Sequence, residues 1–79
     1  MLYSFFTAAK TVTPSDTADL PATARGLLVN GATSVVNVAV ITAQGDDVVL
    51  PLASGYAHLI SVRRVKATNT TATSVLALY

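Results

Sequence analysis

The stretch Ser34–Leu52, SVVNVAVITAQGDDVVLPL, decides the fold of this chain. From Val36 to Val40 a valine stands at every second position, with Asn37 between the first two. Successive side chains of a β-strand point to opposite faces, so these valines share a face that fits a core, and Asn37 faces outward or into a subunit contact. Gln44–Asp47 (QGDD) is a turn signal, and another apolar run follows it. Two antiparallel strands joined by a short connection are therefore predicted.

The rest of the chain has the same character. Val, Ile and Thr are abundant, while Glu is absent and Gln, Lys and Met are rare, which favours strands over helices. Turn signals divide the chain into about six short strands. The expected strands are Phe6–Val12, Arg25–Asn30, Ser34–Ile41, Val48–Leu52, Ala57–Lys66 and Thr73–Leu78. We therefore expect an all-β fold, a small antiparallel β-barrel or β-sandwich in which residues 1–79 form a single domain.

The fifth expected strand contains a change of phase. Alternation from His58 to Val62 puts apolar side chains on one face, but the next apolar residue is Val65, and Arg63 and Arg64 stand where the alternation slips. A β-bulge explains the slip most simply, because it inserts one extra residue into one strand of a pair.

Two segments are not expected to belong to the sheets. Residues 13–24 (TPSDTADLPATA) contain two prolines and two aspartates without any periodicity. This pattern predicts a long ordered loop or arm that wraps around the domain. Residues 1–10 begin with an apolar run and are interpreted as an extended N-terminal arm that overlaps the first strand.

Size and composition predict association. A domain of 79 residues hides only about 60% of its unfolded surface, and such small domains usually need a disulfide, a metal or a partner. The chain has no cysteine and one histidine, and 52% of its residues are hydrophobic while 11% are charged. Soluble domains average about 25% charged residues. We interpret the excess apolar surface as contact area between subunits.

Charge and hydropathy exclude several classes of protein. A net charge of +1 gives no electrostatic reason for nucleic-acid binding, which usually requires a domain pI above about 9. No apolar run approaches the roughly 18 residues of a membrane-spanning helix. Residues 1–9 (MLYSFFTAA) lack a preceding basic residue, so an export signal is not expected. The absence of cysteine fits a reducing cytoplasm.

The residues that could carry catalysis or bind a metal are few. His58 is the only side chain suited to general base catalysis near neutral pH, and it has no acidic neighbour in sequence. Asp16 with Asp19, and Asp46 with Asp47, are the only carboxylate pairs. All four aspartates occur in turn contexts, where Asp commonly binds its own backbone. We interpret these five residues as structural and expect no enzyme activity, cofactor or metal.

One basic cluster is present at residues 63–66 (RRVK). With Tyr56, Phe5 and Phe6 it could form the stacking and phosphate-binding face of an OB-like module for single-stranded nucleic acid. It could instead be a solvated strand edge or a contact to acidic groups of a neighbouring subunit, and we favour these two interpretations. A glycan-binding adhesion domain is a further alternative for the chain as a whole.

Three stretches resemble the small head-spike base and decoration proteins of gene transfer agents and tailed phages. They are Thr13–Pro21 (TPSDTADLP), Arg25–Gly31 (RGLLVNG) and Ser61–Tyr79 (SVRRVKATNTTATSVLALY). The last stretch is the most specific, because it combines a basic strand, a Thr-rich turn and a terminal V-x-A-L-Y sequence. The chain departs from the family pattern at Met1–Ala9 and at Val35–Ile41.

The resemblance implies a structural virion protein, a β subunit that forms a homo-oligomeric ring, pentamer or trimer, on the capsid surface. It implies contacts with further copies of the chain, with the major capsid protein and with a spike or fibre protein. The implied location is the virion, after assembly in the host cytoplasm. The expected subunit or capsid contacts are Arg63, Arg64, Lys66, Leu2, Tyr3, Phe5 and Phe6.

Overall fold

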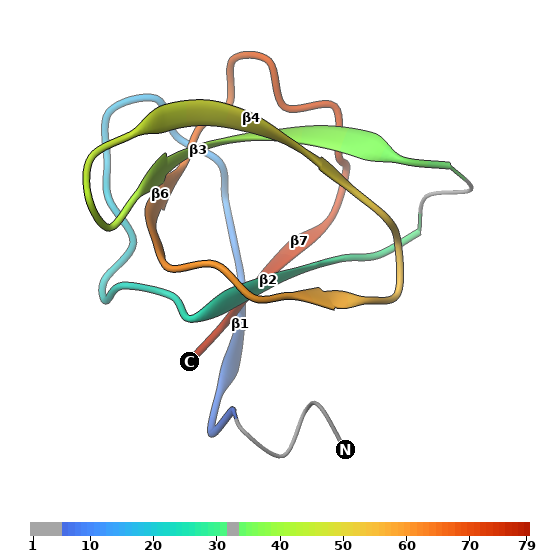
Figure 1. The fold of residues 1–79 in the computed structure, drawn as a ribbon, viewed down its shortest axis with the longest axis horizontal. Helices are drawn as coiled ribbons and strands as arrows, with labels where there is room; N and C mark the ends of the chain where they lie inside the picture. The colour runs from blue at the N-terminus through green and yellow to red at the C-terminus, as the bar shows by residue number, and fades with distance from the viewer. Residues whose placement is uncertain (1–5, 32–33) are drawn as a thin grey trace.

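The computed structural model describes residues 6–31 and 34–79, which form two antiparallel sheets packed as a sandwich (Figure 1). Its seven strands are β1 (Ala9–Thr11), β2 (Gly26–Val29), β3 (Val36–Thr42), β4 (Asp47–Leu52), β5 (Ala57–His58), β6 (Val62–Val65) and β7 (Val75–Leu78). Sheet A has the order β1-β7-β2-β5, and sheet B the order β4-β3-β6. The all-β prediction is confirmed, and of its two alternatives the sandwich is correct, because the sheets do not close into a barrel. No helix that could cross a membrane occurs in the described residues.

The core lies between the inner faces of the two sheets and consists mainly of valine. Its largest fully enclosed side chains are Leu27, Val29, Val38, Val40, Val62, Val65 and Val75. The alternation predicted in β3 is confirmed, since Val38 and Val40 are 0% exposed while Asn37 lies on the exposed side. Branched side chains suit a thin sandwich because their stiff rotamers pack well on a pleated surface.

The expected strand over residues 57–66 is wrong in one respect, because it is two strands. β5 pairs with β2 in sheet A, whereas β6 pairs with β3 in sheet B. The chain crosses from one sheet to the other at residues 59–61, where Leu59 is 66% exposed. Residues 59–61 form no strand, so β5 and β6 are separate and seven strands replace the expected six.

The predicted bulge is present in β6. Ile41 of β3 pairs with Arg64, while the next residue of β3 pairs with Val62. Arg63 is therefore an extra residue without a partner across the ladder. Because of this extra residue, Val62 and Val65 both face the core, at 0% and 2% exposure, although three positions separate them.

Residues 13–24, which we call the strap, run along the outer edge of β6 without forming a regular strand. The N–H groups of Ser15, Leu20 and Ala24 donate to backbone carbonyls of β6 at 2.9, 2.7 and 2.8 Å. These bonds are too widely spaced for a ladder because the two prolines of the strap interrupt pairing. The strap nevertheless occupies the edge of sheet B that β6 would otherwise expose.

Candidate interaction surfaces

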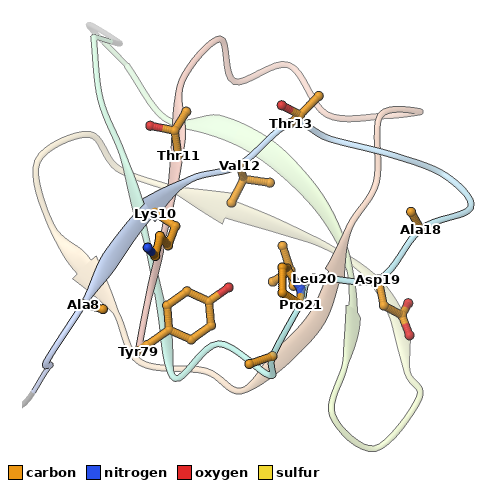
Figure 2. Close-up of a pocket in the computed structure, with 11 residues that line it drawn as sticks. Ala8, Lys10, Thr11, Val12, Thr13, Ala18, Asp19, Leu20, Pro21 and Tyr79 are labelled. Atoms are coloured by element: carbon orange, nitrogen blue, oxygen red, sulfur yellow. The ribbon is translucent and has the colours of Figure 1, made fainter.

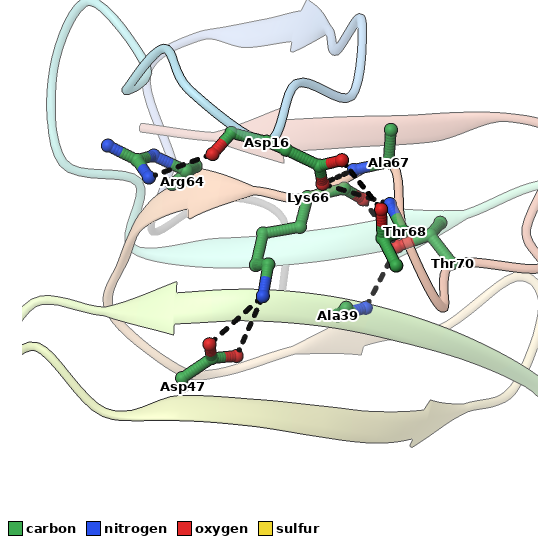
Figure 3. A network of polar contacts seen from close by, with 8 residues as sticks. All are labelled: Asp16, Ala39, Asp47, Arg64, Lys66, Ala67, Thr68 and Thr70. Carbon is green, nitrogen blue, oxygen red and sulfur yellow. Dashed lines mark hydrogen bonds and ion pairs between the residues drawn. The ribbon is translucent and has the colours of Figure 1, made fainter.

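A polar network fixes the strap to the connection between β6 and β7 (Figure 3). The Asp16 carboxylate accepts hydrogen bonds from the N–H groups of Ala67 and Thr68, both at 2.9 Å, and from the Thr68 hydroxyl at 2.6 Å. The bonds from the hydroxyl and then the N–H of Thr68 lower the pKa of Asp16. The Asp16 carboxylate therefore binds a turn remote in sequence, and not the backbone of its own turn as its sequence context had suggested.

The three cations of the basic cluster have different surroundings. Arg64 donates from Nε to Asp19 Oδ1 at 2.8 Å and from Nη1 to the Asp16 carbonyl at 3.1 Å. Lys66 Nζ lies 2.9 Å from Asp47 Oδ2. Figure 3 shows Lys66 extended across sheet B toward this carboxylate.

Arg63, the bulged residue, makes no hydrogen bond or ion pair with its side chain within the described part of the chain. It is exposed, whereas Arg64 and Lys66 are partly buried. Two of the three charges are thus balanced by aspartates of the same chain. This arrangement argues against the OB-like module, because the one cation of the cluster that remains unpaired among the described residues provides little attraction for a polyanion.

The aromatic contact candidates lie near the start of the chain. Leu2, Tyr3 and Phe5 lie outside the described residues. Phe6 is half-buried, and a Cβ atom on Gly26 would lie 3.2 Å from the edge of its ring. Phe6 therefore packs on the outer side of sheet A, where a side chain larger than glycine would collide with it.

The histidine and the carboxylates do not converge. His58 Nε2 lies 3.0 Å from the Ala53 carbonyl oxygen. Asp19 and Asp47 are each paired with a different cation, and Asp46 interacts with a threonine four residues earlier. Among the residues that the structure describes, no group of three or more acidic, histidine or cysteine side chains could hold a metal.

The outer face of sheet A carries no charge along its central row. Each of the four strands contributes one residue to this row. The four residues are directly paired and therefore share one face: Thr11, Leu76, Leu28 and Ala57. The corresponding row on sheet B contains a negative and a positive side chain, Asp47 and Arg64, beside Ile41 of β3. The two central strands, β7 and β2, are apolar on both faces, a pattern typical of sheets covered on both sides. The outer face of sheet A thus has the chemistry of a contact surface.

Three of the four sheet edges are protected against pairing. The strap covers β6, and β5 has only two residues. On β4, the partner of Pro51 is Asn37, whose N–H and C=O bind Thr71 on the opposite side. Pro51 therefore sits at a position that faces the open edge, where its missing N–H blocks an incoming strand.

The fourth edge, β1, borders an open groove of about 750 Å³ (Figure 2). The groove lies between β1 and the strap, and the ring of Tyr79 stands between its two walls in Figure 2. Its lining is mainly apolar and includes Ala8, Val12, Leu20, Pro21, Ala22 and Tyr79. Two charged residues, Lys10 and Asp19, also line it. We call this feature the β1 groove.

The sequence did not indicate this groove. Its walls come from residues 8–13, from residues 18–22 and from Tyr79, three segments that only the folded chain brings together. A lysine among short apolar residues was the single local signal, and it is common at strand edges.

Comparison with known proteins gives a similarity to a solved structure. No protein-family model matches the sequence, and no curated protein matches it. The structure is similar to a chain in a solved structure described as the capsid of a native GTA particle, computed with C5 symmetry, where GTA stands for gene transfer agent. The TM-score is 0.79 at 26% sequence identity, and the match covers 94% of this chain and 83% of the other. The resemblance noted in the sequence is therefore confirmed at the level of a chain in such a capsid.

Proposed function

We propose that this chain is a structural subunit of a capsid particle of the gene-transfer-agent or tailed-phage type, where it serves as a head-spike base or decoration protein. The observation that carries this proposal is the similarity to a gene transfer agent capsid chain over 94% of the present chain.

The contacts would be made by several copies of the chain in a ring. The matched capsid structure was computed with five-fold symmetry. A pentamer is the ring that fits a position on a five-fold axis. The outer face of sheet A, whose central row is uncharged, would supply a surface for neighbouring copies or for the major capsid protein. Burial of this face would offset the small core that a chain of 79 residues can form.

The basic cluster and the N-terminal aromatic residues are proposed as further contacts. Arg63 is the best candidate of the cluster, since its guanidinium has no partner within the described residues. Arg64 and Lys66 would contribute less directly, because they hold the strap and β4 in place. Phe6, with Leu2, Tyr3 and Phe5 before it, would extend the apolar contact toward the capsid or a spike or fibre protein.

The first test is the mass of the purified chain by native mass spectrometry, followed by its copy number in purified particles. A ring of defined size that is present in particles is expected. A monomer at micromolar concentration that is absent from particles would contradict the proposal.

A matched pair of variants tests the contact face. Leu28→Thr places a hydroxyl on the outer face of sheet A, while Val49→Thr makes the same kind of change at a residue of β4 that is 46% exposed. We expect Leu28→Thr to weaken the ring and Val49→Thr to leave it intact. Equal ring stability in both variants would exclude this face as the contact.

A further inference from the structure

Among the residues that the structure describes, none pairs with the outer edge of β1, which leaves this edge open to a new strand. Tyr79 N donates to Ala8 O at 2.8 Å, and Val12 N donates to Val75 O at 2.9 Å. Because backbone groups in an antiparallel pair point alternately toward and away from the partner, the N–H and C=O groups of Ala9 and Thr11 turn away from β7. These four groups form a short row that an extended peptide can pair with.

The β1 groove lies beside this open row. A strand added to β1 would send every second side chain to the inner side of sheet A, where Lys10 and Tyr79 line the groove. The opposite wall, Leu20 and Pro21, would enclose those side chains from the strap side (Figure 2). A volume of about 750 Å³ lies in the range of sites that enclose a ligand.

The charge of the groove selects the occupant. Asp19 is already paired with Arg64, whereas Lys10 has no polar side-chain partner within the described residues. The groove therefore presents one unbalanced positive charge in an apolar surrounding, which favours a carboxylate and disfavours a basic or wholly apolar strand. Met1–Phe5 of a second copy contains no acidic residue and does not meet this requirement.

We propose that the β1 groove binds an extended segment of a different protein by strand addition, with apolar side chains at alternate positions and one carboxylate beside Lys10. The inference extends the proposed function, in that the segment would belong to another protein of the particle. It is tested on the isolated chain, so it can fail while ring formation and particle incorporation still hold.

The probe is a capped, fluorescent seven-residue peptide in which threonine and valine alternate, beginning and ending with threonine, and the central valine is replaced by aspartate. A second peptide carries lysine at that position, and fluorescence anisotropy measures both affinities. We expect the aspartate peptide to bind about tenfold more tightly than the lysine peptide. Lys10→Glu should reverse this preference, while Arg63→Ala, which changes another unpaired cation, should leave it unaltered.

A separate variant tests the backbone pairing at the β1 edge. Thr11→Pro removes an N–H that faces away from β7, and proline is tolerated at such edge positions, as Pro51 illustrates. Aspartate-peptide affinity should fall about tenfold, with the circular dichroism spectrum unchanged. The proposal is overturned by equal affinity for both peptides, by no binding at millimolar peptide, or by binding that neither variant alters. A ring that Thr11→Pro dissociates, without peptide binding, would instead assign the edge to a second copy.

Discussion

Arg63 and Arg64 are neighbours with the same side chain, and we predict that their replacement by alanine has different effects on stability. Arg64 loses an ion pair whose side chains are 25% and 47% exposed, together with a hydrogen bond to a backbone carbonyl. A pair this exposed contributes about 0.2–1 kcal/mol, and the additional hydrogen bond about 0.5–1.5 kcal/mol. Arg64→Ala should therefore lower the free energy of unfolding by about 1–2 kcal/mol.

Arg63→Ala removes no intramolecular hydrogen bond or ion pair within the described residues, so its effect should stay within about 0.5 kcal/mol. In a domain of this size, about 1 kcal/mol shifts the melting temperature by about 4–8 °C, so the two variants should differ clearly. Arg64→Lys keeps the charge but lacks the planar arrangement of Nε and Nη1, so it should recover only part of the loss.

Urea unfolding followed by circular dichroism at one fixed protein concentration measures these differences, because association also contributes to apparent stability. A double-mutant cycle with Asp19→Asn isolates the ion pair, for which we expect a coupling of about 0.2–1 kcal/mol. Equal destabilisation by Arg63→Ala and Arg64→Ala would refute the assignment of separate roles to the two arginines.

Three further predictions concern the strap, the core and a turn. Since hydrogen bonds lower the pKa of Asp16 below its usual value of 3.8, their contribution is complete above that pH and is lost as the pH falls through the folded-state pKa. Asp16→Asn should flatten this acid-side decline in a series of melting curves, and an unchanged decline would contradict it. Leu27→Ala should cost about 2–5 kcal/mol at a site that is 0% exposed, and Leu59→Ala, at 66% exposure, under about 0.5 kcal/mol in the same urea assay. Gly45→Ala should cost about 1 kcal/mol, because Gly45 has a φ of 97°, while the added Cβ would meet only the Arg63 side chain, at an ordinary contact distance of 4.0 Å. An unaltered midpoint would show that the turn relaxes.

Local patterns predicted those parts of the structure that depend on local physics. The alternation at Val36–Val40 determined which face of β3 is buried, and the slip at Arg63 indicated the bulge, because both follow from the two-residue period of a strand. The break between β5 and β6 was missed, since an apolar run gives no sign of which sheet it pairs with. The partners of Asp16 were also missed, because Ala67 and Thr68 lie 51 and 52 positions away.

The central position of β7 in sheet A has a consequence for biosynthesis. Within residues 6–31 and 34–79, β1 has no strand partner other than β7, and β2 pairs with β7 along its whole length. On the ribosome, the β3 and β4 hairpin can form as soon as it emerges, but sheet A must wait for Val75–Leu78. A nascent chain that stops before this strand would present neither the uncharged face nor the β1 groove, whose wall includes Tyr79. We therefore expect a chain truncated before Val75 to be excluded from assembly.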